Sequence, residues 1–288
     1  MSDSAPVLRD LFDRPIFIVS TPRSGSTLLF ETLAQAPDLF TTGDESHRLI
    51  ESIPELIPAL RGWDSNRLTA EDAAPVVAAH LARMFYGRLC DRDGRPADER
   101  VRMLEKTPKN ALRVPFFDAI WSDSLFVYLY RDPRQTLASM IRAWQSGRFR
   151  TYPRLPGWRG PDWSLLLVPG WRELNGLPVP EIAARQWTTT TNILIDDLSA
   201  LPKERVRVID YDAFVRAPHD ALQTLAPALG LGWDRTLPPV LPPSRMTLTA
   251  PGADKWRDLE PEIDAVLPLV EEADRRSREF AARLARPA

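Results

Sequence analysis

The sequence predicts an α/β fold in which a central, mainly parallel sheet of about four to five strands is flanked by helices on both faces. Short apolar runs alternate along the chain with segments of helical periodicity, which is the pattern of parallel sheets. One run, Leu125–Tyr130, is apolar throughout, as strands buried on both faces usually are. Three runs end in polar clusters, and ligands in such sheets bind beyond the carboxyl ends of the strands.

The order of the elements follows from these runs and from the prolines between them. The first strand is expected over Ile16–Val19, followed by a tight turn and a helix that carries Leu28, Leu29 and Leu33. Proline is tolerated in the first turn of a helix but breaks its interior. The remaining elements are expected in this order: a helix over 49–60 interrupted at Pro54 and Pro58, a helix over 70–89, a strand over 101–104, a helix over about 111–120, the strand over 125–130, a helix from Pro133, a helix over 180–198, a strand over 205–209, a helix over 213–229 broken at Pro218 with a second break open at Pro227, and a charged helix over about 262–284.

The composition is that of a globular chain with a large core. Its 288 residues are 44% hydrophobic, and we expect one domain over residues 1–288. The net charge of −2 offers no overall basic field for nucleic acid. Cys90 is the only cysteine, which excludes an internal disulfide and a cysteine-based metal cluster. His47, His80 and His219 are too scattered to suggest a metal site, so no metal is expected.

The hydropathy pattern predicts no membrane segment. No apolar run approaches the roughly 18 residues that a membrane span needs. Residues 1–13 are polar and acidic and lack the apolar core of a secretory signal. We therefore expect a cytoplasmic protein, while the sequence leaves its oligomeric state open.

Residues 148–179 form an irregular segment rich in Pro, Gly and Trp. Long irregular loops in compact domains are often lids or binding loops. Trp158, Trp163 and Trp171 therefore suggest a segment that shapes an apolar acceptor pocket. The alternative is a separate hydrophobic cluster that anchors the loop.

The turn after the first strand, residues 21–27, has the features of a phosphate or sulfate cradle. The N-terminus of a helix carries unpaired N–H groups and a positive dipole end. Gly25 lets the backbone approach a ligand closely, and Arg23 adds a positive charge. The turn lacks the Gly-Lys-Ser/Thr ending of the nucleotide P-loop. The alternative is an ordinary strand–turn–helix junction, since Ser and Thr are common N-caps.

Two further polar clusters follow strands, at Glu105–Asn110 and at Arg131–Ser139. Arg131 leaves a buried strand, where an unpaired charge is costly unless an anion meets it. Its guanidinium suits bidentate binding of a phosphate, and the Ser139 hydroxyl could share that anion. The alternatives are a salt bridge from Arg131 to Asp132 or another carboxylate, and a helix-packing role for Ser139.

At these positions the sequence resembles the sulfotransferases that use 3′-phosphoadenylyl sulfate (PAPS). Their 5′ phosphosulfate signature is similar to Thr21-Pro22-Arg23-Ser24-Gly25-Ser26-Thr27, and their 3′ phosphate signature to Tyr128–Arg134 with Ser139. The resemblance spans about residues 15–256. It implies a P-loop-like three-layer sandwich and sulfuryl transfer to a hydroxyl or amine, with a small molecule as the favoured acceptor. It also implies roles for Arg23, Ser24, Gly25, Ser26 and Thr27 at the 5′ group, and for Arg131 and Ser139 at the 3′ phosphate.

The resemblance also implies catalytic residues. Lys106 matches a family lysine that supports the leaving phosphate, although Pro108 replaces the histidine base of the cytosolic enzymes. Gly43-Asp44-Glu45-Ser46-His47 resembles the Gly-Glu-Glu-Thr-Arg element of tyrosylprotein sulfotransferases, which makes Glu45 the favoured base. His47 is the alternative base, because an imidazole titrates near neutrality. A third possibility is that the cluster only caps the next helix.

Three later residues complete the expected donor site by resemblance. Tyr211 matches a family tyrosine near the nucleotide, with core packing as the alternative. The loop 244–249 leads to Lys255 and Trp256, which are expected at a phosphate and at the adenine. Their alternatives are a solvated lysine and a buried tryptophan.

Two other function classes stay open at this stage. A P-loop kinase would place a carboxylate after a strand to position Mg²⁺, whereas the strand here ends in Arg131. Fixed cations can stabilise a transferring sulfuryl group, which carries less negative charge than a phosphoryl group, without a metal. A non-catalytic nucleotide-binding protein would bind the nucleotide and transfer nothing.

Overall fold

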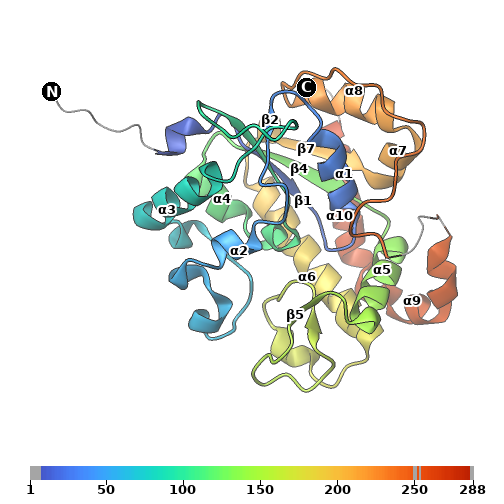
Figure 1. The fold of residues 1–288 in the computed structure, drawn as a ribbon. Helices are drawn as coiled ribbons and strands as arrows, with labels where there is room; N and C mark the ends of the chain where they lie inside the picture. The colour runs from blue at the N-terminus through green and yellow to red at the C-terminus, as the bar shows by residue number, and fades with distance from the viewer. Residues whose placement is uncertain (1–7, 249–251, 253, 286–288) are drawn as a thin grey trace.

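The core of the fold is a five-stranded parallel sheet with the strand order β2-β3-β1-β4-β7 (Figure 1). The computed structural model describes residues 8–248, 252 and 254–285. The strands are β1 (Ile16–Val19), β2 (Leu39–Phe40), β3 (Arg102–Glu105), β4 (Leu125–Tyr130) and β7 (Val206–Asp210). The predicted fold class is confirmed. Strand β2 was not expected, because two residues are too few to show a period.

Helices cover both faces of the sheet, as the three-layer prediction requires. In β1 and β4, alternate side chains point to opposite faces. The face that carries Phe17 and Phe126 packs against α3 (Pro75–Tyr86), α4 (Val114–Ile120), α6 (Val179–Ser199) and α10 (Glu271–Ala285). The face that carries Ile16 and Val127 packs against α1 (Ser26–Leu33), α7 (Tyr211–Arg216) and α8 (Pro218–Ala228) (Figure 1).

The strand register places the polar clusters at one edge. Ile16 of β1 lies opposite Leu125 of β4 and Leu104 of β3. The segments that follow the three strands therefore leave the sheet side by side, because parallel strands share their carboxyl edge. This register brings together the turn at Arg23, the segment from Lys106 and the segment from Arg131.

Proline accounts for the differences between the expected and observed helices. The expected helix over 49–60 is a single turn, α2 (His47–Ile50), followed by two short 3₁₀ helices that begin at Pro54 and Pro58. Each proline lacks the N–H that would continue the α-helix. The break at Pro218 is confirmed, because α7 ends at Arg216 and α8 begins at Pro218. A break at Pro227 does not occur, because α8 continues through Pro227 to Ala228.

Three other expected helices have different limits. The helix expected over 70–89 begins only at Pro75, and the one expected over 111–120 begins at Val114 after a 3₁₀ helix over Pro108–Leu112. The charged C-terminal helix is divided into α9 (Glu260–Val266), the 3₁₀ helix Leu267–Leu269 and α10. Pro268 lies in that 3₁₀ helix and interrupts the α-helical hydrogen bonds.

A second hydrophobic core lies beside the sheet. It joins α5 (Pro133–Ser146), α6, α9 and the Trp-rich segment, which contains a small antiparallel sheet of β5 (Arg150–Tyr152) and β6 (Trp163–Ser164). The ring of Trp163 lies 5.3 Å from that of Trp144 and 4.9 Å from that of Trp158 between centroids. The Trp-rich segment is thereby anchored to the helices. Within the described residues, no helix has the length and apolar character needed to cross a bilayer.

Candidate active site

A cavity of about 660 Å³ opens at the carboxyl edge of the sheet. Its lining includes most of the residues that the sequence singled out: Arg23, Gly25, Ser26, Thr27, Glu45, His47, Arg131, Ser139, Tyr211, Lys255 and Trp256. Ser24 and Lys106 are not part of the lining, although Lys106 contacts two residues that are, Thr27 and Glu45. The volume is typical of small-molecule sites.

The β1–α1 turn presents backbone N–H groups to this cavity. Gly25 is the N-cap of α1 and has a φ of 98°, a conformation that favours glycine. It has no side chain to cap the helix, and no acidic residue lies in the first turn. The Ser24 hydroxyl is buried and lies 2.7 Å from Thr21 Oγ1, so it stabilises the turn itself. The first N–H groups of α1 are therefore placed for an anion.

Tyr211 packs directly against this turn. A Cβ atom at Gly25 would lie 2.1 Å from Cε2 of the Tyr211 ring, so only glycine fits there. The guanidinium of Arg131 lies 4.2 Å from the centre of the same ring. Tyr211 is 8% exposed and lines the cavity, so it combines core packing with a place in the site.

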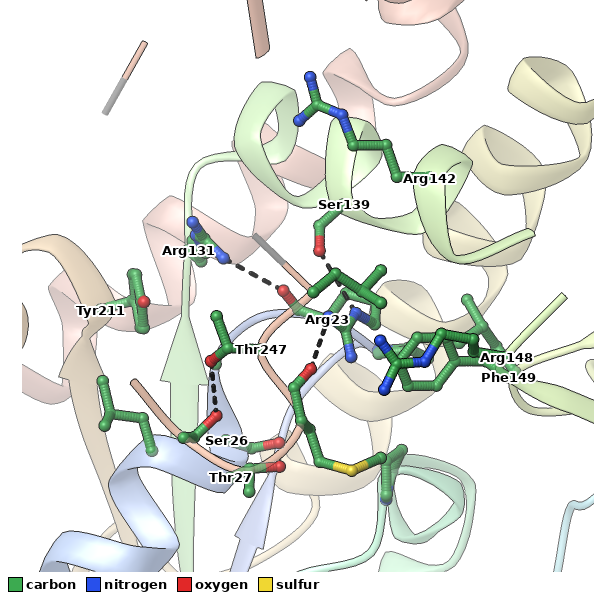
Figure 2. A pocket seen from close by; sticks show the side chains of 18 of the residues that line it. Arg23, Ser26, Thr27, Arg131, Ser139, Arg142, Arg148, Phe149, Tyr211 and Thr247 are labelled. Carbon is green, nitrogen blue, oxygen red and sulfur yellow. Dashed lines mark hydrogen bonds between the residues drawn. The ribbon is translucent and has the colours of Figure 1, made fainter. Parts of the chain in front are cut away.

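Arg23 connects three segments of the cavity wall. Its Nε donates to Ser139 Oγ over 3.3 Å, and Nη2 donates to the carbonyl of Met246 over 3.1 Å. Figure 2 shows the guanidinium near Phe149, whose ring centre is 4.3 Å away. Burial and the nearby charge of Arg131 lower the pKa of Arg23 to about 10. A buried cation beside a second cation favours a bound anion.

Arg131 does not form the salt bridge to Asp132 that was the alternative interpretation. Its Nη1 donates to the carbonyl of Arg23 over 3.2 Å, and its Nη2 to Gln135 Oε1 over 2.9 Å (Figure 2 shows the bond to Arg23). The Asp132 carboxylate instead accepts from the N–H of Arg134 and Gln135. Burial lowers the pKa of Arg131. Within the described ranges no carboxylate forms an ion pair with it.

Lys106, Glu45 and His47 form one chain of polar contacts. Lys106 Nζ donates to Thr27 Oγ1 over 3.1 Å and to Glu45 Oε1 over 2.8 Å. The other Glu45 oxygen lies 3.7 Å from His47 Nδ1. Burial and the charge of Lys109 lower the pKa of His47, which favours the neutral imidazole. The structure thus places Glu45 beside the lysine and His47 beside Glu45.

A buried network explains why Glu45 meets Lys106. Ser46 donates from its backbone N–H to Thr107 Oγ1 over 2.8 Å and from its hydroxyl to Glu105 Oε1 over 2.5 Å. Burial raises the pKa of Glu105. Ser46 stands at the N-cap of α2, but its hydroxyl bonds to Glu105 and does not cap the helix. Ser46 thus binds to Glu105 and Thr107, the two residues that flank Lys106, and this holds the neighbouring Glu45 next to Lys106.

The Trp-rich segment contributes to the cavity through residues other than its tryptophans. Phe149, Tyr152, Leu165 and Leu166 line the cavity, while Trp163 and Trp171 are fully buried in the second core. The tryptophans therefore anchor the segment, as the alternative interpretation held, and their neighbours shape the wall. Thr249 of the loop 244–249 lies outside the described residues.

Several cavity residues escaped the sequence analysis. Gln135 holds Arg131, and Glu51, Lys109 and Tyr152 form a second polar cluster on the wall. The sequence offered one signal for this second cluster, the position of Lys109 in the polar cluster after β3. Its partners are 58 and 43 residues away along the chain, beyond the reach of local patterns.

The fold and the site together define a class of protein. A parallel sheet whose first strand runs through a glycine turn into a helix N-terminus, with the cavity at that edge, is a P-loop-like α/β protein.

Comparison with known proteins then identifies the family. The model of the sulfotransferase family matches residues 15–163, and the chain belongs to this family. A Caenorhabditis briggsae protein named "Putative protein-tyrosine sulfotransferase" is 26% identical over 130 residues, or 45% of this chain and 44% of that protein. The matched region thus spans less than half the length of this relative. The resemblance inferred from the two signatures is confirmed.

One solved structure supports the fold, and a second is reported as similar. Sulfotransferase STF1 from Mycobacterium tuberculosis H37Rv has a TM-score of 0.50 and 14% identity, with 90% of this chain and 76% of that chain covered. A sulfotransferase from Alicyclobacillus acidocaldarius has a TM-score of 0.47 and 17% identity over 90% of this chain and 95% of that chain.

Proposed function

We propose that this sulfotransferase moves the sulfuryl group of PAPS to a hydroxyl or amine of a small-molecule acceptor. The observation that carries the proposal is the meeting of two cationic segments in one cavity. Arg131 donates to the carbonyl of Arg23, 108 residues away, and Arg23 donates to Ser139. Two separate anions of one nucleotide could be held by such a pair of segments.

The residues fit this donor. The uncapped N-terminus of α1 and Arg23 would hold the 5′ phosphosulfate. Arg131, which forms no ion pair with any described carboxylate, and Ser139 would hold the 3′ phosphate. Trp256 lines the same cavity with Lys255 and lies near the guanidinium of Arg134, 5.6 Å from the ring centre. We assign Trp256 to the adenine and Lys255 to a phosphate.

Bound PAPS supplies an activated sulfuryl group with a phosphate leaving group. As the acceptor oxygen or nitrogen attacks sulfur, Glu45 would take its proton. The bond from sulfur to the bridging oxygen breaks, and its electron pair stays on the phosphate of 3′,5′-adenosine bisphosphate. Lys106 uses two of its three N–H donors on Thr27 and Glu45, which leaves one for that oxygen. Arg23 and the start of α1 would stabilise the developing charge.

Glu45 is preferred to His47 as the base because of its contacts. Lys106 holds one Glu45 oxygen at 2.8 Å, which fixes the position of the carboxylate at the cavity wall. His47 Nδ1 lies 3.7 Å from the other oxygen, beyond hydrogen-bond distance, so the imidazole is held less firmly than the carboxylate.

Calorimetric titration with 3′,5′-adenosine bisphosphate, beside ATP with Mg²⁺, tests the donor assignment. We expect the bisphosphate to bind without metal and ATP–Mg²⁺ to bind weakly. Tight binding of ATP–Mg²⁺ alone would identify a kinase. Binding of the bisphosphate without transfer from ³⁵S-labelled PAPS to a panel of phenols, alcohols and amines would identify a binding protein.

The Glu45→Gln variant tests the base. Removing a general base should lower kcat by roughly 10²- to 10⁴-fold while bisphosphate affinity is retained. The exposed Glu55→Gln serves as the matched control. Near-normal turnover in Glu45→Gln would exclude Glu45 as the base.

A further inference from the structure

A second polar cluster lies on the cavity wall beyond the proposed base. Lys109 Nζ contacts both Glu51 carboxylate oxygens at 2.8 Å and the Tyr152 hydroxyl oxygen at 3.0 Å. Asn66 Nδ2 contacts the same hydroxyl oxygen at 2.6 Å. Glu51, Lys109 and Tyr152 all line the cavity. The proposed mechanism uses none of these residues.

The O–H group of Tyr152 donates to no acceptor among the described residues. An ammonium group only donates, and so does the NH₂ group of an amide. Asn66 is held in this orientation because its Oδ1 accepts from the Leu167 N–H over 2.6 Å. Tyr152 therefore accepts from both neighbours and cannot donate to either. Among the described residues no acceptor for its proton is found, so the O–H group is left for a molecule in the cavity.

The residues around Tyr152 keep its hydroxyl protonated and give the cluster a net positive charge. Burial and the charge of Glu51 raise the pKa of Tyr152 well above its ordinary value. Glu51 is paired with two cations, Lys109 and the fully buried Arg113, whose Nη2 lies 2.7 Å from Glu51. One negative charge between two positive charges leaves the cluster cationic, and a cationic cluster favours an anionic oxygen.

The Tyr152 ring is held firmly, and apolar side chains adjoin it. Trp63 packs edge-on against the ring with 5.5 Å between centroids, and Lys109 Nζ lies 5.0 Å from the ring centre. Phe149, Leu165 and Leu166 complete this part of the cavity wall. A ligand here would have an apolar body and a polar oxygen.

We propose that Tyr152 is a specificity-determining residue that donates a hydrogen bond to a second oxygen group of the acceptor, with a carboxylate preferred. The acceptor is then a hydroxylated molecule with an apolar body and an anionic oxygen away from the reacting group. This inference rests on the proposed function, because it assigns the wall beyond Glu45 to the acceptor. Tyr152 positions the acceptor and takes no part in the chemical step.

Three phenols test this proposal; they share a 4-hydroxyphenyl ring and a two-carbon chain, which ends in a carboxylate, in no further group or in an ammonium. 3-(4-Hydroxyphenyl)propionate, 4-ethylphenol and tyramine are titrated calorimetrically into the enzyme saturated with 3′,5′-adenosine bisphosphate. We expect the propionate to bind most tightly. Tyr152→Phe should weaken its binding by roughly 10- to 100-fold, the range for a hydrogen bond to a charged group, and leave 4-ethylphenol unchanged.

The matched control is Tyr86→Phe, which removes a tyrosine hydroxyl that donates to the Glu99 carbonyl outside the cavity. It should bind all three phenols as the native enzyme does. Thermal unfolding and bisphosphate affinity show whether Tyr152→Phe is folded.

Three results would overturn the assignment: unchanged propionate binding in Tyr152→Phe, a native preference for tyramine, or native enzyme that binds none of the phenols. The native comparison stands even where the variant does not fold. If the native enzyme does not bind the bisphosphate, the proposed function itself has failed, and this result is separate from the other three.

Discussion

The N-termini of α1 and α5 follow neighbouring parallel strands yet are built in opposite ways. Helix α1 begins after Gly25, which leaves its first N–H groups without a side-chain cap. Helix α5 is closed by the Asp132 carboxylate, which accepts from the N–H of Arg134 and Gln135, and by Pro133 in its first turn. Both ends open at the same edge of the sheet.

The difference shows two ways to make an anion site from one topology. At α1 the backbone is available, so the ligand itself can complete the helix end. At α5 the backbone is satisfied internally, and side chains face the cavity, among them those of Arg131 and Ser139. The proposed 5′ site therefore depends on glycine and helix geometry, and the proposed 3′ site on a buried guanidinium.

The largest effect on bisphosphate binding is expected from Gly25→Ala, which alters the backbone turn of the proposed 5′ site. The new Cβ would lie 2.1 Å from the Tyr211 ring at a φ of +98°, so the turn or the tyrosine must move. Overpacking of this kind costs about 1–3 kcal/mol, and we expect bisphosphate affinity to fall by roughly 100-fold. Calorimetry measures the loss. Gly87→Ala, at the C-cap of α3 with a φ of −67°, is the control, and normal binding by Gly25→Ala would contradict a backbone site.

A smaller and more selective effect is expected from Arg131→Ala at the side-chain site. Loss of charge-assisted hydrogen bonds should weaken bisphosphate binding by roughly 10- to 100-fold. Adenosine 5′-monophosphate lacks the 3′ phosphate, and its affinity should stay unchanged. The ratio of the two dissociation constants is the measurement. An equal loss for both nucleotides would show that Arg131 supports the turn at Arg23 and not the 3′ phosphate.

The smallest effect on the ligand is expected from Asp132→Ala. The variant removes the α5 cap, which is typically worth about 1 kcal/mol, so Tm should fall by a few degrees. Bisphosphate affinity should be retained, because the α5 backbone is not part of the proposed site. Asp210→Ala removes a similar cap from α7 and provides the comparison for stability. Weaker binding of the bisphosphate with an unchanged Tm would show that the N-terminus of α5 takes part in ligand binding, as is proposed for α1.

Much of the sheet could be predicted from the sequence, because buried strands are continuous apolar runs. The strand Leu125–Tyr130 was predicted with its observed limits, while the two-residue strand β2 left no pattern. Helix limits were less predictable, as at 49–60, where Pro54 and Pro58 divide the segment into short turns. Periodicity identifies apolar faces, but proline and local hydrogen bonds decide where a helix begins.

Part of the candidate active site could be predicted from the sequence. The polar residues that follow β1, β3 and β4 were identified because parallel strands must end at a common edge. The cluster around Tyr152 was not, because Asn66, Lys109 and Tyr152 come from three distant segments. The tryptophans of residues 148–179 suggested a pocket, but their bulk is buried and anchors the segment instead.

The sequence by itself determined the parallel sheet, the glycine turn into α1 and the sulfotransferase signatures, because these depend on neighbouring residues. Only the tertiary structure decided that Arg131 donates to the Arg23 carbonyl and that Lys106 pairs with Glu45. These contacts join segments 108 and 61 residues apart. Their existence depends on which strands lie side by side, and the strand order is set by packing of the whole sheet.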